Sequence, residues 1–480
     1  MKWVLSTIQW GEKILIDKTH SFDKTIIRAY DIRGIYNKTL FDLDAKIIGN
    51  LFGLKIGANK NVNIAYDGRM SSESLKKNLV EGLLEVGANV TDIGLSPTPL
   101  LYFSCLKNNA SGGIMITGSH NPKDHNGFKF VLNNMPFYGD DLLELSENSK
   151  KFSFKSTKGK RTYKCFKDDY INRIFEGIDL KNKLNIAWDA GNGVAGELMS
   201  QIAKKINTQN FLLFENVDGN FPNHHPDPSD PKNLEDCINL IKQKKLDCGI
   251  AFDGDGDRIG VIDDKGRVLS GDQLLLLFSY EILKKKKGAK IIGDVKCSQV
   301  LFDEIKKKHG IPIISQTGHS HVKTNIKKNK ADLAGEMSGH IFFNLDYYGF
   351  DDALYSSVKL VELLDKQGEK LSDIIDKFPK AFNTPEIRVE CDDLKKFEII
   401  NKVITNQKSK NQDVIDIDGI RVSSENGWWL LRASNTQAEL VLRCEANSKE
   451  NLKKELSLVK DAIFEVDSQL SQKILVENYV

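Results

Sequence analysis

The feature that most constrains the fold is a pattern that occurs three times along the 480 residues. Each time, an apolar run leads to an aspartate and is followed by a segment with the apolar spacing of a helix. The runs are NIAYDGR (63–69), LNIAWDAGNG (184–193) and AKIIGDVK (289–296), with their aspartates at Asp67, Asp189 and Asp294. The predicted helices cover about 72–86, 196–206 and 298–309. Second and third apolar runs follow each helix, and this order predicts three related α/β units.

Each third run ends in an unusual loop of small and polar residues. The loops read TGSHNP (117–122), DGDGDR (253–258) and GEMSGH (335–340). Ligands of α/β units usually bind beyond the carboxyl ends of the strands, so we expect these loops to carry the function.

From about residue 381 the pattern changes to alternating strands, PEIRVEC, VIDIDGIRVS, GWWLLRAS and AELVLRCEA, before a final helix at about 448–470. We therefore predict an α/β protein with three related α/β domains and a C-terminal α+β domain. The expected boundaries are 24–160, 161–267, 268–380 and 381–480.

Charge and hydropathy exclude several classes of partner. Lys plus Arg is 68 and Asp plus Glu is 66, so the net charge of +2 gives no basic excess for nucleic acid. The longest apolar stretch, Leu274 to Phe278, is far shorter than a membrane span, and no signal-like segment begins the chain. We expect a cytoplasmic protein, a monomer or weak dimer, that binds neither nucleic acid nor membrane. Seven scattered cysteines predict free thiols.

The DGDGDR loop predicts a metal site. Asp253, Asp255 and Asp257 occupy alternate positions, so an extended loop turns all three carboxylates to one side. Each close pair would cost about 4 kcal/mol at about 4 Å with an effective dielectric constant near 20, and a divalent cation is the simplest compensation. A solvated acidic loop is the alternative. An EF-hand is disfavoured, because Arg258 stands where that motif needs glycine and the preceding segment is strand-like. Arg258 also suggests that the cation meets an anion.

The TGSHNP loop places one hydroxyl, that of Ser119, at a strand end. An ordinary turn is the alternative interpretation. A hydrolase elbow is disfavoured because Asn121 replaces the last glycine of its motif. A phosphorylated Ser119 would carry a charge of about −1.5 to −2 and an oxygen able to coordinate the metal of the acidic trio.

Two further motifs offer donors for a phosphorylated sugar. RASNT (432–436), with Arg443 beyond it, supplies guanidinium, hydroxyl and amide groups that suit phosphate oxygens, although a salt-bridged strand and turn is the alternative. GEMSGH supplies Glu336, Ser338 and His340, whose side chains suit neighbouring sugar hydroxyls.

These four motifs, in this order, resemble the α-D-phosphohexomutase family. With its methionine, the GEMSGH motif is most similar to that of the bacterial phosphomannomutase/phosphoglucomutase branch. The resemblance to the family extends from about Arg28 to the C-terminus. It implies three related α/β domains and a TATA-box-binding-protein-like fourth domain around a central cleft.

The resemblance also implies a role for each matching residue. Ser119 would be the phosphoserine, and Mg²⁺ would be held by its phosphate with Asp253, Asp255 and Asp257. Arg258 would stabilise the transferring phosphoryl group. The candidates for proton transfer, which the sequence does not rank, are His120, Lys129 and His340. The implied substrate contacts are Tyr30, Arg33, Lys296, Gly318, His319, Glu336, Met337, Ser338, Gly339 and His340, and for the non-reacting phosphate Arg432, Ala433, Ser434, Asn435, Thr436 and Arg443.

The implied reaction interconverts the 1-phospho and 6-phospho forms of mannose and glucose through a hexose 1,6-bisphosphate, which would also act as activator. Phosphoglucosamine mutase is one alternative, although it usually has Gln where Met337 stands. A metal-dependent sugar phosphatase would use the same Ser119 and aspartates without needing the other two motifs. An inactive sugar-phosphate sensor would more naturally have lost one of those residues.

Overall fold

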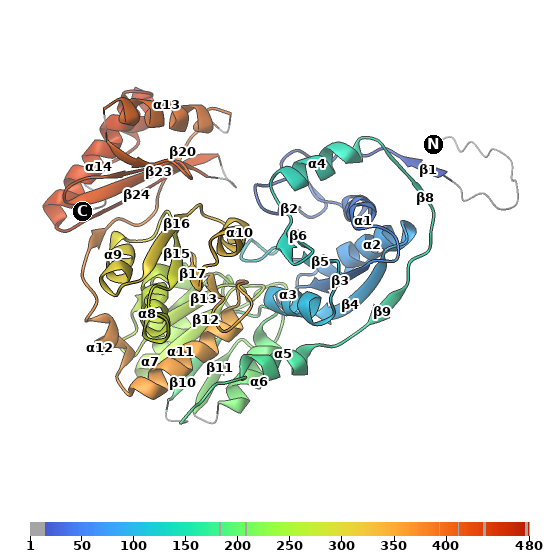
Figure 1. Ribbon diagram of the computed structural model, residues 1–480, viewed down its shortest axis with the longest axis horizontal. Helices are drawn as coiled ribbons and strands as arrows, with labels where there is room; N and C mark the ends of the chain where they lie inside the picture. The colour runs from blue at the N-terminus through green and yellow to red at the C-terminus, as the bar shows by residue number, and fades with distance from the viewer. Residues whose placement is uncertain are drawn as a thin grey trace, which may run out of the picture. The chain divides into compact units, whose positions relative to one another are not determined.

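The computed structural model describes residues 15–181, 184–206, 209–392, 394–410, 412–434, 438–475 and 479 (Figure 1). The chain forms two compact units. Unit 1 comprises the chain up to Tyr170 together with Val217–Pro222, and unit 2 comprises Ile171–Asn216 together with Asn223–Val480. Each unit is described by itself.

Unit 1 is built on a mixed sheet with the strand order β2-β6-β5-β3-β4-β9, and β7 pairs with β6. Its strands are β2 (Ile32–Ile35), β3 (Asn61–Tyr66), β4 (Asn89–Leu95), β5 (Gly112–Ile116), β6 (His125–Leu132), β7 (Met135–Pro136) and β9 (Arg161–Tyr163). Its helices are α1 (Asp42–Ile56), α2 (Ser72–Glu85), α3 (Thr98–Lys107) and α4 (Asp140–Ser149). The central strand β3 runs parallel to β4 and β5, whereas β6 is antiparallel to β5.

Alternate residues of β3 explain why helices cover both faces of this sheet. Val62 and Ile64 join the hydrophobic core that α1 and α2 close. Between them, Asn63 donates from Nδ2 to Ser104 Oγ of α3 at 2.9 Å. Successive side chains of a strand point to opposite faces, so the sheet lies between two helical layers.

The residues that precede the family resemblance contribute a strand. β1 (Leu15–Lys18) pairs antiparallel with β8 (Phe152–Lys155) in a two-stranded sheet. Lys18 also donates to Asn50 of α1 and pairs with Glu85 at 2.8 Å. This segment is therefore tied to unit 1 by backbone pairing and by charge.

Unit 2 contains two further sheets, with the strand orders β11-β10-β12-β13-β14 and β16-β15-β17-β18. Their strands are β10 (Ile186–Asp189), β11 (Asn210–Leu213), β12 (Cys248–Phe252), β13 (Ile259–Asp263), β14 (Val268–Leu269), β15 (Lys290–Asp294), β16 (Ile311–Ser315), β17 (Leu333–Gly335) and β18 (Ile341–Phe343). The helices of this part are α5 (Lys167–Ile174), which begins in unit 1, α6 (Gly196–Lys205), the 3₁₀ helix η1 (Pro231–Leu234), α7 (Glu235–Lys244), α8 (Gly271–Lys285), α9 (Gln299–Lys307), α10 (His319–Asn329), α11 (Ala353–Gln367) and α12 (Leu371–Ile375).

Both sheets repeat the plan of unit 1. β10 runs parallel to β11 and β12, and β15 runs parallel to β16 and β17. The three predicted helices are confirmed as α2, α6 and α9. An antiparallel strand then follows the third strand of each repeat, as β6, β13 and β18, and these strands were not among the predicted elements. Each motif loop is therefore the turn between two hydrogen-bonded strands, which fixes both of its ends.

The C-terminal part is an antiparallel sheet with the strand order β19-β24-β23-β22-β21, in which β20 also pairs with β24. Its elements are β19 (Phe382–Asn383), β20 (Ile387–Glu390), α13 (Lys396–Ser409), β21 (Asp413–Ile415), β22 (Ile420–Ser423), β23 (Gly427–Ala433), β24 (Glu439–Ala446), α14 (Lys449–Phe464) and α15 (Ser468–Gln472). Helices α13 and α14 share one hydrophobic core with the sheet. The predicted α+β domain is confirmed, although α13 was not predicted.

The prediction of one final helix over about 448–470 was wrong in its extent. Helix α14 ends at Phe464, and the carboxylate of Asp467 accepts a hydrogen bond from the backbone N–H of Leu470 at 2.9 Å. That N-cap begins the separate helix α15, because an aspartate side chain satisfies a backbone donor that the start of a helix leaves unpaired.

A buried arginine joins the third sheet of the chain to the C-terminal domain. Arg421 of β22 is 1% exposed, and its guanidinium lies 3.7 Å from the ring centre of Trp428. It donates to the carbonyls of Val295 and Cys297 at 2.9 and 2.8 Å. Burial lowers the pKa of Arg421 to about 10, which leaves the side chain charged at neutral pH.

Among the described residues, no helix combines the length and apolar character needed to cross a bilayer. All seven cysteines have free thiols, and five of them are buried.

Replacing Arg421 should weaken this joint. Arg421→Ala leaves two buried carbonyls without their donor, so we expect a loss of about 2 to 4 kcal/mol in unfolding free energy. Lys410→Ala, which removes a partly exposed ion pair with Glu465 in the same domain, should cost less than about 0.5 kcal/mol. Urea unfolding followed by tryptophan fluorescence measures both, and equal losses would contradict the assigned role.

Candidate functional site

The loop that carries Ser119 connects β5 to β6 in unit 1. Ser119 is 2% exposed and has a backbone φ of 49°, which few residues other than glycine adopt. Its backbone N–H donates to Thr117 Oγ1 at 2.7 Å, and its Oγ lies 3.2 Å from His120 Nδ1. The candidate phosphoserine and one candidate proton carrier are therefore in contact.

Sequence reasoning missed Arg69, which makes several hydrogen bonds to this loop. Arg69, three residues beyond β3, is 2% exposed and donates to four backbone carbonyls between Ser119 and His125. Its Nε also donates to Asp67, the first aspartate of the repeat, at 3.2 Å. The DGR that ends the first run was the available signal, because arginine is far rarer than lysine in this sequence and here follows a strand-ending aspartate.

Three other predicted residues of unit 1 lie on or near β2 and β6. Arg33 of β2 donates from Nη1 to Asn121 Oδ1 of the loop at 2.7 Å and also pairs with Asp31. Lys129 of β6 is 4% exposed. Tyr30 is partly buried and lies two residues before β2.

The acidic trio occupies the turn between β12 and β13 in unit 2. Asp253, Asp255 and Asp257 are all fully buried, and one carboxylate oxygen from each lies within 4.8 Å of the others. Three enclosed negative charges at this spacing repel one another strongly, and hard oxygen donors are the ligands that Mg²⁺ or Ca²⁺ prefers. The residues present therefore fit a divalent cation. β12 precedes the loop, so the expectation of a strand before it is confirmed.

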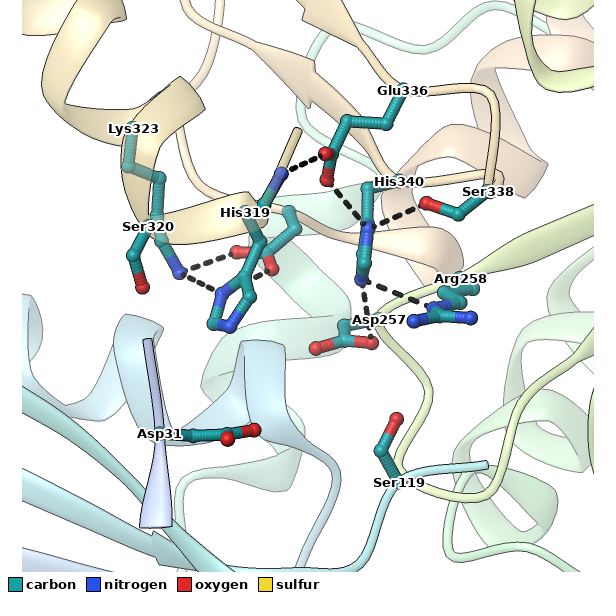
Figure 2. Close-up of polar contacts among 12 residues, drawn as sticks. Asp31, Ser119, Asp257, Arg258, His319, Ser320, Lys323, Glu336, Ser338 and His340 are labelled. Carbon is teal, nitrogen blue, oxygen red and sulfur yellow. Dashed lines mark hydrogen bonds and ion pairs between the residues drawn. The ribbon is translucent and has the colours of Figure 1, made fainter. Parts of the chain in front are cut away.

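His340 connects the trio to the GEMSGH loop (Figure 2). Its Nδ1 lies 2.8 Å from Glu336 Oε2, and its Nε2 lies 3.2 Å from Asp257 Oδ1. Ser338 Oγ is 3.1 Å from Nδ1, and Arg258 Nε is 3.4 Å from Nε2. Burial disfavours the imidazolium, but the two carboxylates outweigh burial and raise the pKa of His340 to about 9. A cation at the trio would compete with this imidazolium for Asp257.

Two glycines, Gly318 and Gly339, contribute to the contacts around Glu336 and His340. Gly318 donates its backbone N–H to Glu336 Oε1 at 2.5 Å. Gly339 has a φ of 91°, and a Cβ there would lie 2.5 Å from the carbonyl oxygen of Ile259. The loop therefore approaches the backbone of β13 more closely than a larger residue allows. Met337 is partly buried beside them.

His319, at the start of α10, belongs to a buried group that the sequence did not predict. Lys323 donates from Nζ to Asp351 Oδ1 at 2.9 Å and lies 3.1 Å from His319 Nδ1 (Figure 2). Burial alone would raise the pKa of Asp351, but Lys323 and His319 hold it well below its usual value. Asp257, His340 and Asp351 could also surround a metal ion. Because the Lys323 ammonium already neutralises Asp351, the trio fits a cation better than this second group does.

Two predicted phosphate or substrate contacts are held by carboxylates. Lys296 donates to Glu386 Oε1 at 2.9 Å, and the lysine ammonium lowers the pKa of Glu386 to about 2. Arg432 of β23 is 7% exposed and pairs with Asp418 at 3.2 Å. Neither Glu386 nor Asp418 was predicted from the sequence.

The remaining predicted residues follow β23 or lie on β24. Ala433 and Ser434 are buried, whereas Asn435 and Thr436 lie outside the described residues. Arg443 is 4% exposed, and its Nη2 lies 3.9 Å from Asp272 Oδ2 of α8. This placement gives Arg443 a partner at the joint between the third sheet and the C-terminal domain.

The domain models of the phosphoglucomutase/phosphomannomutase family match four successive stretches of the chain. Alpha/beta/alpha domains I, II and III match residues 24–155, 168–266 and 270–382, and the C-terminal domain matches 386–462. The chain belongs to this family.

Individual relatives agree with that assignment. The chain is 42% identical to the phosphomannomutase/phosphoglucomutase of Pseudomonas syringae pv. tomato over 90% of its length and 93% of that protein. It is 40% identical to the phosphoglucomutase of Neisseria gonorrhoeae over 89% and 94% of the two chains. A crystal structure of a phosphoglucomutase/phosphomannomutase family protein from Burkholderia thailandensis matches with a TM-score of 0.86 and 38% identity, and covers 92% and 98% of the two chains.

Removing one carboxylate of the trio should weaken the binding of a divalent cation. Asp255→Asn replaces an anionic ligand by a neutral one and also relieves repulsion, so we expect at least about a 10-fold loss of affinity with an intact fold. Mn²⁺ binding, followed by electron paramagnetic resonance, measures the affinity without any substrate. Asp236→Asn, an exposed position on α7, is the matched control. Equal affinities for the two variants would show that the trio does not hold the metal.

Proposed function

We propose that the protein interconverts the 1-phospho and 6-phospho forms of mannose and glucose through a phosphoserine and a hexose 1,6-bisphosphate. One observation carries the proposal beyond family membership. The loop that suits sugar hydroxyls and the loop that suits a metal meet at His340, which contacts Glu336 and Asp257 at 2.8 and 3.2 Å. Phosphoryl transfer to a sugar hydroxyl needs both kinds of group beside the reacting atoms.

In this proposal Ser119 carries the phosphoryl group. The bond between phosphorus and Ser119 Oγ breaks as a bond forms to a sugar hydroxyl oxygen, and the hydroxyl proton passes to a side chain of the protein. The bisphosphate then turns end for end, and its other phosphoryl group returns to Ser119 by the reverse step. His120, Lys129 and His340 are the proposed proton carriers. Arg258 neutralises charge on the transferring group.

The proposed metal is Mg²⁺, held by Asp253, Asp255 and Asp257 together with the phosphate on Ser119. When bound, it supplies positive charge that stabilises the transferring phosphoryl group. The proposal also includes activation by hexose 1,6-bisphosphate, a monomer or weak dimer, and a cytoplasmic location.

The proposed substrate contacts come from the first, third and fourth domains. Glu336 and Ser338 are proposed to bind the 3- and 4-hydroxyls, with Lys296 and His319 as further contacts. Mannose and glucose differ at the 2-hydroxyl, so a site that binds the 3- and 4-hydroxyls accepts both. Arg432, aligned by Asp418, is proposed to bind the non-reacting phosphate with the residues that follow it. Tyr30 and Arg33 are proposed contacts from the first domain. The four domain boundaries expected from the sequence stay part of this proposal.

A coupled assay with mannose 1-phosphate, glucose 1-phosphate and glucosamine 1-phosphate tests the activity, each with Mg²⁺ and trace hexose 1,6-bisphosphate. We expect mannose and glucose substrates to react at rates within about tenfold of each other. They differ at the 2-hydroxyl, and a hydroxyl that the site does not bind specifically contributes no more than about one neutral hydrogen bond. Preference for glucosamine 1-phosphate would identify a phosphoglucosamine mutase. Release of inorganic phosphate without isomerisation would identify a phosphatase.

The role of Ser119 has a matched control at the other end of strand β5. Ser119 follows β5, and Ser111 precedes it. We expect Ser119→Ala to lose isomerisation by more than about 1,000-fold and to take up no phosphate from glucose 1,6-bisphosphate. Ser111→Ala should keep both properties. Peptide mass spectrometry locates the phosphate, and a phosphopeptide that never contains Ser119 would refute the assignment.

Arg432→Ala separates the mutase from a phosphatase. Loss of a charge-assisted hydrogen bond to the distal phosphate is worth about 1.5 to 3 kcal/mol, or about 10- to 150-fold in kcat/KM. We expect that loss for mannose 1-phosphate and glucose 1-phosphate alike, together with more free bisphosphate in solution. Lys408→Ala removes an exposed ion pair with Asp416 in the same domain and should change neither quantity. Unchanged kinetics for Arg432→Ala would show that the fourth domain does not contribute to the substrate site.

A further inference from the structure

The loop that carries Ser119 has a conformation that its own sequence does not favour. Ser119 has a φ of 49° in a buried position, so its backbone lies in the sparsely populated left-handed region. Such a conformation persists only where surrounding contacts determine it. The contacts that do so come from two neighbouring side chains of unit 1, Arg69 and Asp67.

Arg69 determines the second half of the loop. Its Nη2 donates to the carbonyl oxygens of Ser119 and Asn121, each at 2.6 Å. Its Nη1 donates to the carbonyl oxygens of Pro122 and His125, the latter at 3.0 Å. One planar guanidinium therefore fixes four peptide groups of a seven-residue span.

Asp67 determines the first half. Its carboxylate accepts hydrogen bonds from Thr117 Oγ1 at 2.8 Å and from the backbone N–H of Gly118 at 3.1 Å. It also accepts from Arg69 Nε and from Ser72 Oγ, which aligns both side chains. The loop is thus held by the Asp67 carboxylate and the Arg69 guanidinium, which also bond to each other.

Gly118 leaves space for the guanidinium. A Cβ at this position would lie 2.6 Å from both Nε and Cζ of Arg69 and 2.8 Å from the carbonyl oxygen of His125. Arg69 therefore packs directly against the backbone of the loop. Lysine cannot reproduce this arrangement, because a single ammonium lacks the planar set of donors.

A short arm from a distant part of the sequence covers Arg69 on another side. The arm, Val217–Pro222, belongs to unit 1 although the residues on either side of it belong to unit 2. The Phe221 ring centre lies 5.2 Å from Arg69 Cζ. Gly219 packs on the backbone, since a Cβ there would lie 2.4 Å from the Gly68 oxygen and 2.7 Å from Arg69 Cα.

Asn192, three residues beyond β10, bonds to the two residues that flank the arm. Its Nδ2 donates to the carbonyl oxygen of Asn216, and its Oδ1 accepts from Asn223 Nδ2, each at 2.8 Å. Within the arm, the backbone N–H of Phe221 donates to the carbonyl oxygen of Asp218 at 3.0 Å. The arm is therefore a closed turn with fixed ends, and it presents Phe221 to Arg69.

We propose that Arg69 is a positioning residue for phosphoryl transfer: it holds the Ser119 loop in its reactive conformation, and the arm Val217–Pro222 holds Arg69. The inference rests on the proposed function, because it takes Ser119 as the residue that carries the phosphoryl group. Arg69 acts through four carbonyls of the loop and not on the reacting atoms. A segment far along the chain thereby helps to set the geometry of a loop in the same unit.

The test compares Arg69→Lys, Arg69→Ala and Phe221→Leu with the wild type. A displacement of about 1 Å at a reacting group costs about 100-fold. We therefore expect kcat to fall about 100-fold in both Arg69 variants and about 10-fold in Phe221→Leu, with KM for glucose 1-phosphate changed less than about 3-fold. The rate at which glucose 1,6-bisphosphate phosphorylates Ser119, read by mass spectrometry, should fall in parallel. Added guanidinium should partly restore kcat of Arg69→Ala.

Arg161 and Tyr163 provide the matched control in the same unit. Arg161 pairs with Asp92 at 2.6 Å, and its Cζ lies 4.6 Å from the Tyr163 ring centre, on strand β9. Arg161→Lys and Tyr163→Leu should leave kcat and KM unchanged. If Arg69→Ala does not fold, Arg69→Lys and Phe221→Leu, with circular dichroism as a check, still decide the question.

Several outcomes would overturn the proposal. Wild-type kcat in Arg69→Lys would show that the planar donor set is not needed. Wild-type kcat in Phe221→Leu would show that the arm is not needed to hold Arg69. Equal losses in the Arg161 and Arg69 variants would indicate a purely structural role. If the wild type isomerises the sugar phosphates and is phosphorylated on Ser119, and the Arg69 and Phe221 variants are fully active, this inference alone is refuted. A wild type without that activity refutes the proposed function first.

Discussion

Parallel pairing of a central strand with both of its neighbours is the constraint on which the three α/β domains depend. β3, β10 and β15 each lie between two parallel partners, so three strand ends meet at one edge of each sheet. The aspartate at or just after each central strand then accepts hydrogen bonds from that edge. Asp67 binds the Ser119 loop, Asp189 accepts from Gly191 and contacts His224, and Asp294 contacts Cys297 and Thr317. One repeated residue therefore organises three different loops.

Charge in the interior of unit 2 is balanced by contact between unlike groups. His340 lies between Glu336 and Asp257, and Lys323 lies between His319 and Asp351. Isolated buried charges would be costly, and each carboxylate here is compensated by a cation or a hydrogen-bond donor. The two histidine rings lie 5.7 Å apart, so the two groups form one continuous polar region. A cation at the acidic trio would alter this region through Asp257.

Three arginines of the C-terminal domain serve different purposes although the sequence presents them alike. Arg421 is stacked on Trp428 and holds the joint with the third sheet. Arg443 has Asp272 of that sheet's first helix as its partner. Arg432 pairs with Asp418, whose Oδ2 also accepts the backbone N–H of Thr317 at 3.1 Å. The prediction that Arg443 binds phosphate stays a prediction, and its burial at the joint offers a structural reason for its presence.

The sequence alone determined the repeated strand order, the positions of three helices and the loops that hold Ser119, the acidic trio and His340, because these features follow from local periodicity and motif spacing. It also indicated the family, since four motifs occur in one order. Only the tertiary structure decided which distant side chains meet. Arg69 was not predicted because its four acceptors are backbone carbonyls, so the DGR sequence that contains it does not indicate its partners. Asp351, Glu386 and Asp418 were missed because an ion pair leaves no local pattern when its partners are far apart in the chain. The arm Val217–Pro222 was invisible for the same reason: its place depends on the close approach of Gly219 to Gly68, a contact that exists only after the strands have paired.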